Sequence, residues 1–213
     1  MIEKPEELIN NLIERLIAPY SVETLLRYLK TILKRRIEKK EVLTFGESVK
    51  NYLLALYERC SLVTNLIFRD EPGLISKYFF PLRFQNGRNT ENELTQILTK
   101  YLKERNTKVS VVTNYVIGGT AGIGKSTVLK HWSLSLIKST NFIPIFVELR
   151  MLNNLKLSLE ELLYRELEIQ NVRVSEEIFK YFLNYGFFVV FLDGFDEIRE
   201  KDKACTIFDG MNS

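Results

Sequence analysis

The chain contains little of what several common kinds of functional site require. Among its 213 residues there is one histidine, His131, so chemistry that needs two histidines is excluded. We interpret His131 as a helix-surface or packing residue. The two cysteines, Cys60 and Cys205, lie far apart and lack the spacing of metal ligands. This pattern indicates a reducing compartment rather than a fold held by disulfides.

The sequence also lacks the marks of a secreted or membrane-spanning protein. Its first residues read M-I-E-K-P-E-E, with acids where a secretory signal carries bases, and no apolar run reaches transmembrane length. We therefore expect a cytoplasmic protein. The net charge of +3 is too small to indicate nucleic-acid binding. The basic run Lys34–Lys40 is more typical of a solvated helix face than of a nucleic-acid or membrane patch.

What the sequence does contain is a glycine loop, Gly119–Thr127, which reads G-T-A-G-I-G-K-S-T and matches G-x-x-x-x-G-K-[ST]. Its glycines allow tight turns that direct several backbone N–H groups at one anion. Lys125 would reach the β- and γ-phosphates of a nucleotide, and the Ser126 hydroxyl would bind Mg²⁺. The predicted nucleotide-binding residues are Gly119, Thr120, Ala121, Gly122, Ile123, Gly124, Lys125, Ser126 and Thr127. The alternative is a glycine-rich turn without a ligand.

The flanks of the loop favour the nucleotide interpretation. Val109–Ile117 is rich in β-branched residues and predicts a strand, and Val128–Lys138 has a helical pattern. The helix begins near Lys125, so its positive end would point at the phosphates. Strand, glycine loop and helix in this order are the context that the motif requires.

A second motif follows a wholly apolar run, Phe187–Leu192, which predicts a central parallel strand covered on both faces. It ends in Asp193-Gly194-Phe195-Asp196-Glu197. Ligands of open α/β sheets bind beyond the carboxyl ends of the strands, so Asp193 should emerge beside the glycine loop and hold Mg²⁺. Asp196 or Glu197 would orient or deprotonate the attacking water, with no basis for dividing these roles. The alternative is an acidic turn.

Strands alternating with helices predict an α/β fold with a parallel sheet. Phe142–Leu149 is a further predicted strand, and Ser158 and Ser175 are predicted to begin helices, the second of which ends at Gly186. We divide the chain into a helical module (1–73), a connecting segment and helix (74–108) and an α/β domain (109–213).

The helical module should contain helices over residues 4–17 and from Ser21 to Ile37, and a third that begins at the capping box Thr44-x-x-Glu47 and continues to Ile67. Ile75–Phe84 is expected to be extended. A second capping box, Thr90-x-x-Glu93, should begin a helix that ends at Arg105.

The glycine loop, I-P-I-F-V-E-L-R and F-V-V-F-L-D-G-F-D-E-I together resemble the NACHT family of P-loop NTPases, within the STAND class of signal-transduction ATPases. The resemblance covers about residues 75–200. It implies a three-layer P-loop fold that binds ATP or ADP with Mg²⁺. By position it implies nucleotide binding at Gly119–Thr127, metal binding at Ser126 and Asp193, and support of hydrolysis by Asp196 and Glu197.

The resemblance further implies a switch in which an unidentified activating ligand drives nucleotide exchange and self-association, as in antiviral or innate defence. After Ser213 no strand, winged helix or sensing repeat follows, so we expect a fragment or a truncated reading frame. In this class a strand from that later region lies between the strands of the two motifs, so the sheet should have a gap, which argues against hydrolysis by this piece. The alternatives are another P-loop ATPase, an AAA+ protein or kinase, and a truncated adaptor acting through its N-terminal helices.

Overall fold

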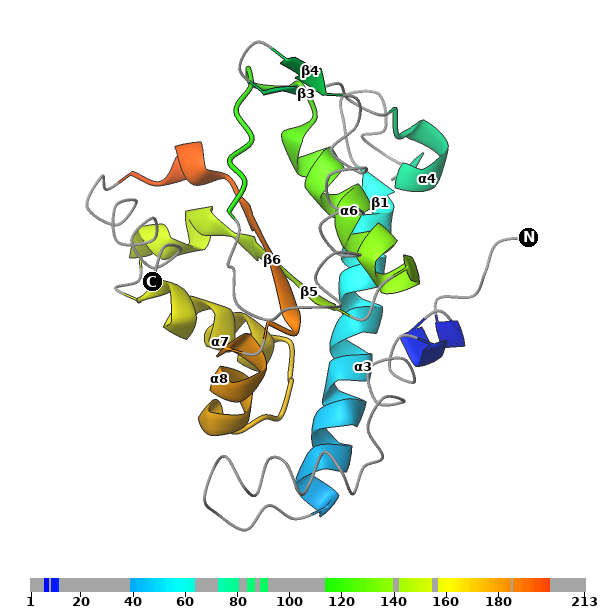
Figure 1. Cartoon of the computed structure of the whole chain (residues 1–213), viewed down its shortest axis with the longest axis vertical. Helices are drawn as coiled ribbons and strands as arrows, with labels where there is room; N and C mark the ends of the chain where they lie inside the picture. The colour runs from blue at the N-terminus through cyan, green and yellow to red at the C-terminus, as the bar shows by residue number, and fades with distance from the viewer. Residues whose placement is uncertain are drawn as a thin grey trace.

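A computed structural model gives the fold of the chain (Figure 1). The residues that the structure describes are 6–7, 9–11, 39–63, 73–80, 84–86, 89–91, 114–139, 142–154, 157–184 and 186–199. Residues 6–7 and 9–11 are helical, in agreement with the first expected helix. The expected helix over 21–37 lies outside the described residues.

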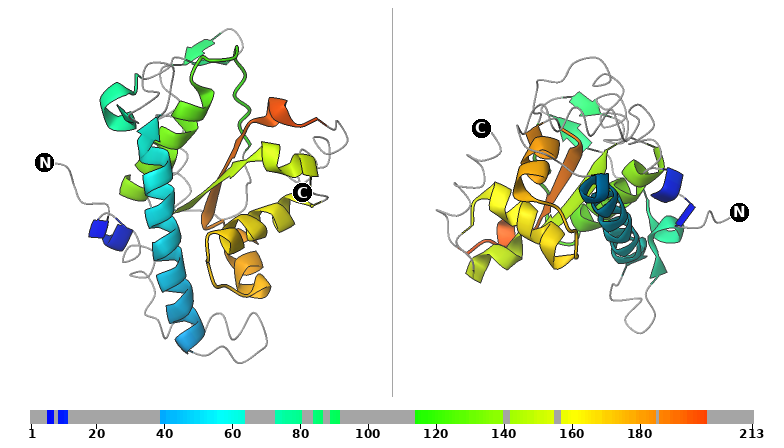
Figure 2. Two further views of the ribbon diagram at one scale, coloured as in Figure 1. Left: turned by 180° about the vertical axis from the view of Figure 1, so that it is seen from behind. Right: turned by 90° about the horizontal axis from the view of Figure 1, so that it is seen from below.

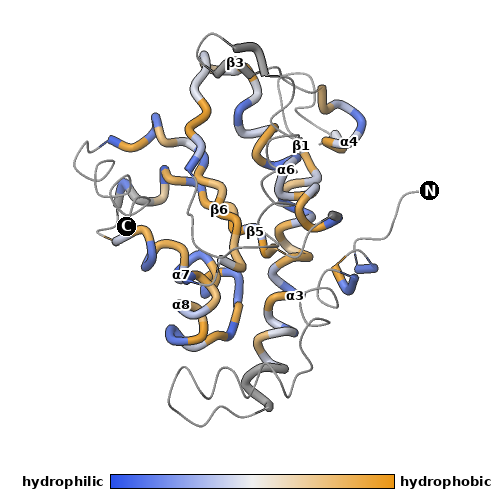
Figure 3. Tube along the Cα trace, viewed as in Figure 1, coloured by the Kyte–Doolittle hydropathy of each residue, from blue (hydrophilic) through white to orange (hydrophobic). Residues whose placement is uncertain are grey.

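The centre of the fold is a parallel pair of strands, β5 (Ile143–Glu148) and β6 (Phe188–Asp193). Their register aligns the two ends, Ile143 with Phe188 and Glu148 with Asp193. Both apolar runs therefore form strands, and the prediction of parallel α/β pairing is confirmed. Figure 3 shows these two strands as mainly hydrophobic segments. In β5 the first five residues are buried, whereas in β6 Phe188 and Phe191 are buried and the others are half-buried. The prediction that β6 is covered on both faces is therefore met in part.

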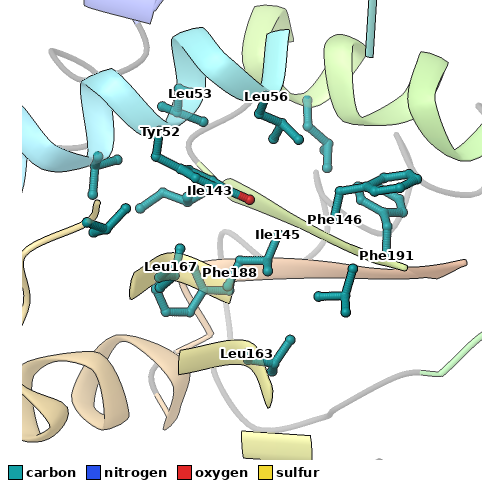
Figure 4. Close-up of a cluster of buried hydrophobic side chains, with 14 of the residues drawn as sticks. Tyr52, Leu53, Leu56, Ile143, Ile145, Phe146, Leu163, Leu167, Phe188 and Phe191 are labelled. Atoms are coloured by element: carbon teal, nitrogen blue, oxygen red, sulfur yellow. The ribbon is translucent and has the colours of Figure 1, made fainter. Parts of the chain in front are cut away.

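Helices lie on both sides of this strand pair (Figures 1 and 2). On one side are α3 (Lys39–Ser61) and α6 (Lys125–Ser139), and on the other are α7 (Leu159–Ile169) and α8 (Glu176–Asn184). Side chains from both sides meet the strands in one hydrophobic core, with Leu53 and Leu56 above β5 and Leu163 and Leu167 below it in Figure 4. Burial of these apolar side chains is what holds the layers together.

The two helices after β5 begin as their sequences predict. Ser158 forms a complete capping box: its Oγ accepts from the backbone N–H of Glu161, whose carboxylate accepts from the backbone N–H of Ser158. Ser175 Oγ accepts from the backbone N–H of Ile178 at 3.4 Å. Gly186, with φ of +66°, follows α8 in the left-handed conformation that glycine adopts most readily.

The expected bounds of the third N-terminal helix are wrong. Helix α3 begins at Lys39, so Thr44 lies inside the helix and cannot act as its N-cap. The upstream residues are good helix formers, and once they are helical the amide groups that a cap would satisfy already have partners. The helix ends at Ser61 rather than Ile67, because Leu62–Val63 forms strand β1 and pairs antiparallel with β2 (Gly73–Leu74).

Residues 75–91 also differ from expectation. Ile75–Tyr78 forms a short helix, α4, instead of an extended segment. Phe84–Asn86 (β3) pairs antiparallel with Asn89–Glu91 (β4). Thr90 is therefore a strand residue opposite Gln85 and does not cap a helix. The rest of that expected helix lies outside the described residues.

The strand expected before the glycine loop is not found where the structure describes it. Residues 114–117 form no strand, and residues 109–113 lie outside the described residues. Strand pairing needs a neighbour with free backbone groups, and the propensity of a segment does not supply one. The expected helix after the loop is confirmed as α6.

Helix α3 packs along β5 through polar as well as apolar side chains. The Tyr52 hydroxyl donates to the carbonyl oxygen of Pro144 at 3.1 Å, and Arg59 Nη2 donates to that of Phe146 at 2.8 Å. These side chains satisfy backbone carbonyls of β5, which is one way to protect a strand edge. Residues 45–60 of α3 thus share one core with the sheet. The boundary near residue 73, between the helical module and the connecting segment, stays a prediction from the sequence.

Across the described parts of the chain, no helix combines the length and apolar character needed to cross a bilayer.

Candidate functional site

The glycine loop follows residues 114–118, leads into α6 and turns sharply at two glycines. Gly122 has φ of +77° and Gly124 has φ of +99°. A side chain at either position would be strained, because L residues rarely adopt positive φ. The backbone N–H of Ile123 donates to the carbonyl oxygen of Thr120 at 3.4 Å within the turn. The loop therefore adopts the tight, exposed turns that its glycines permit.

Space at Gly119 is restricted as well. A Cβ atom built there would lie 3.2 Å from Cγ2 of Ile123, so a larger residue would push against the loop. Thr120 and Ala121 are exposed, and Thr127 is half-buried in the first turn of α6.

Lys125 is the first residue of α6, and its side chain folds back over the loop. Its Nζ donates to the carbonyl oxygens of Gly119 at 3.0 Å and Thr120 at 3.3 Å. The ammonium group thus lies at the mouth of the loop, at the positive end of α6. An anion bound there would meet the lysine and the helix N-terminus together.

The two sequence motifs meet at one hydrogen bond. Ser126 Oγ donates to Asp193 Oδ1 at 3.0 Å, although the two residues are 67 positions apart. Asp193 is the last residue of β6, and Ser126 lies in the first turn of α6. The expectation that Asp193 emerges beside the glycine loop therefore agrees with the geometry.

After Asp193 the chain turns through Gly194, with φ of +75°, into a 3-10 helix, η3 (Phe195–Glu197). Asp196 and Glu197 are both exposed. Among the described residues no group of three His, Cys, Asp or Glu side chains is arranged to hold a metal ion. Asp193, Asp196 and Glu197 therefore do not form a three-carboxylate cluster, although they are close in sequence.

Two further charged residues lie at this edge of the sheet and were not predicted. Glu148 ends β5 and is directly opposite Asp193 in the register. Its carboxylate forms an ion pair with Arg150 in the following 3-10 helix, η2 (Leu149–Asn154). Paired residues on neighbouring strands project to the same face of a sheet. In the sequence, the one feature that points to Glu148 as a site residue is its position at the carboxyl end of a predicted strand.

Asn153, also in η2, was missed because a single asparagine in a loop carries no motif. Its Nδ2 donates to the carbonyl oxygen of Glu197 at 3.0 Å, and its Oδ1 accepts from the backbone N–H of Arg199 at 2.9 Å. The side chain thus connects the segment after β5 to the acidic segment after β6.

Comparison with known proteins identifies no relative: no family matches the sequence, and neither the curated proteins nor the solved structures contain a match.

Proposed function

We propose that this site binds a nucleoside triphosphate or diphosphate together with Mg²⁺. The observation that carries the proposal is the hydrogen bond between Ser126 and Asp193, which joins a glycine loop to the end of a parallel strand. A glycine-rich turn without a ligand would not require a contact between the helix after it and the end of a strand. In open α/β sheets the carboxyl ends of the strands are where ligands bind.

The residues at this edge fit a magnesium nucleotide. Mg²⁺ is commonly held by one or two protein oxygens, with water and phosphate oxygens completing an octahedron. Ser126 and Asp193 supply such a pair of oxygens, so a three-carboxylate cluster is not needed. Lys125 and the loop amides would bind the phosphates. The bound Mg²⁺ would neutralise charge on the phosphate oxygens.

Hydrolysis would require a carboxylate beyond Asp193. Attack of water on the terminal phosphoryl group, with one proton passing to a carboxylate, gives ADP and phosphate. Asp196 and Glu197 are the proposed carboxylates, as they are in the sequence-based hypothesis.

We further propose a P-loop NTPase fold and a signalling switch of the NACHT type. Support comes from the resemblance of the motifs, their order along the chain and the parallel pairing of β5 with β6. In such a switch an activating ligand would change the bound nucleotide and lead to self-association, in antiviral or innate defence. A cytoplasmic location stays a prediction from the sequence.

Nucleotide binding is tested with the Lys125→Ala variant and a fluorescent ADP analogue, titrated with and without Mg²⁺. Loss of a charge-assisted contact to phosphate should raise Kd about 10- to 100-fold. Lys138→Ala, in the last turn of the same helix, is the matched control and should bind like the wild-type chain. Equal affinity of the wild-type and Lys125→Ala chains would show that the loop is not the nucleotide site.

Ser126→Ala separates metal binding from phosphate binding. It removes the hydroxyl that contacts Asp193 and leaves Lys125 in place, so Mg²⁺ should strengthen nucleotide binding much less than in the wild-type chain. The same dependence on Mg²⁺ in both proteins would argue against a metal role for this hydroxyl.

A further inference from the structure

Asn153 makes two hydrogen bonds to the backbone of the acidic segment, on either side of Ile198. The carbonyl oxygen of Glu197 can only accept and the backbone N–H of Arg199 can only donate, so these partners define which end of the amide is Nδ2 and which is Oδ1. One side chain therefore pairs with the acidic segment as a neighbouring strand would. It fixes the backbone immediately after the Asp196–Glu197 pair.

The side chain of Glu197 is turned back toward the end of β6. A Cβ atom built on Gly194 would lie 3.3 Å from Oε1 and 3.4 Å from Cδ of Glu197. The Glu197 carboxylate therefore lies against Gly194, which directly follows Asp193. The positive φ of Gly194 and its missing side chain both permit this arrangement. The backbone N–H of Glu197 also donates to the carbonyl oxygen of Gly194 at 3.0 Å.

We propose that Asn153 is a positioning residue for hydrolysis, and that it acts by holding Glu197 against Gly194, the residue that follows Asp193. Of the two candidate carboxylates, Glu197 is the one whose side chain packs back over Gly194 and whose carbonyl oxygen is fixed by Asn153. Glu197 is thus assigned the role of accepting the proton from water. This inference rests on the proposed nucleotide site and adds a residue from a different segment to it.

The expected consequence is a loss of turnover without a loss of nucleotide affinity. Asn153 has no part in the glycine loop, so binding should not change when it is replaced. A displacement of a catalytic group by about 1 Å can lower a rate about 100-fold. Freeing the segment that carries Glu197 should therefore lower kcat about 10- to 100-fold while Kd for Mg-ADP stays within about twofold.

The test uses the full chain and three replacements. Asn153→Leu has a similar volume and removes both hydrogen bonds. Asn153→Asp keeps an acceptor for Arg199 N–H and loses the donor to Glu197, so it separates the two contacts. Asn184→Ala, at the exposed end of α8, is the control and should leave turnover unchanged. Turnover is measured as phosphate release, and affinity by titration with the fluorescent ADP analogue.

Amide hydrogen exchange at Arg199, measured by NMR, provides a readout that does not depend on hydrolysis. In Asn153→Leu the Arg199 amide should exchange about tenfold faster or more, whereas in Asn153→Asp it should change by less than about threefold. Combining Asn153→Leu with Glu197→Gln should lower kcat no further than Glu197→Gln alone, because both changes act through the same carboxylate.

The possible outcomes separate this inference from the proposed function. Additive losses in the double variant, unchanged kcat in Asn153→Leu, or equal losses of affinity and turnover would each overturn the positioning role. A wild-type chain that binds nucleotide but releases no phosphate would overturn it too, and nucleotide binding would stand. A wild-type chain without affinity for nucleotide would overturn the proposed function itself.

Discussion

Replacing Arg59 with methionine would remove the polar contacts that Arg59 on α3 makes with β5 and α7. The Arg59 guanidinium donates from Nη1 to Glu166 Oε1 at 3.2 Å and from Nη2 to the carbonyl oxygen of Phe146 at 2.8 Å. It also lies over the Phe146 ring, 5.4 Å from the ring centroid. Glu166, on α7, has a side chain that is 4% exposed. One guanidinium therefore links α3, β5 and α7.

The size of the effect follows from these contacts. A hydrogen bond from a charged group contributes about 1.5–3 kcal/mol. Removing one member of a fully buried ion pair costs about 3–5 kcal/mol, because the other charge stays buried. The Arg59 side chain is 34% exposed, so water screens part of that interaction. Methionine keeps some of the apolar packing of the arginine stem. We expect Arg59→Met to lower the free energy of unfolding by about 3 kcal/mol.

The pH dependence of this stability loss tests whether the unpaired charge of Glu166 causes it. Burial raises the pKa of Glu166, and the neighbouring Arg59 partly opposes this by lowering it. Because the folded-state pKa lies above the ordinary value of 4.5, the unfolded chain loses this proton first, and stability declines as pH rises through that interval. Without Arg59 the pKa of Glu166 should rise further. The loss caused by Arg59→Met should then be largest near neutral pH and smaller at about pH 4, where Glu166 is largely protonated in both states.

Urea unfolding of the wild-type chain, Arg59→Met, Glu166→Gln and the double variant measures these differences. The double variant should be more stable than Arg59→Met by about 1 kcal/mol or more, because no buried charge is left unpaired. Equal losses at both pH values, together with strictly additive effects in the double variant, would refute the reasoning.

Three other predictions concern single side chains. Ser158→Ala should lower the free energy of unfolding in urea by about 1 kcal/mol, because it removes a complete capping box. Thr44 has the same sequence pattern but lies inside α3, so Thr44→Ala should not lower it. Equal losses in the two variants would contradict this. Burial, followed by the charge of Lys138, lowers the pKa of His131. Its buried Nδ1 has no hydrogen-bond partner among the described residues, and its ring stacks on that of Phe79 with the ring centroids 3.7 Å apart. As pH falls below 6.5, His131 should take up a proton in the unfolded chain before it does so in the folded chain. Stability should therefore decline until the pH reaches the lower folded-state pKa and then level off, and His131→Phe should lack this decline. Identical curves of stability against pH for the two proteins would contradict this. Burial raises the pKa of Cys60 to about 11. In a Cys205→Ser background, the Cys60 thiol should therefore react with a maleimide much more slowly in the native chain than in urea. Rapid labelling of the native chain would contradict the burial of Cys60.

The capping boxes show how far local sequence reasoning extends. Ser158, Thr44 and Thr90 each precede a glutamate by three residues, and the pattern predicts a helix start at all three. Ser158 caps α7, but Thr44 lies inside α3 and Thr90 lies in β4. The motif offers a partner for free amide groups, and whether those groups are free depends on the residues before it and on strand pairing elsewhere.

The sequence alone determined the elements whose cause is local. The apolar runs became β5 and β6, and Gly122 and Gly124 of the glycine loop adopt the positive φ that other residues avoid. It also indicated that Ser126 and Asp193 belong to one site, since parallel strands end at a common edge. The tertiary structure decided what depends on pairs distant in sequence: α3 on the edge of β5, Glu148 opposite Asp193, and Asn153 on the backbone of Glu197 and Arg199. Such contacts form between groups with no fixed spacing along the chain, so the packing of the elements, and no local pattern, selects them.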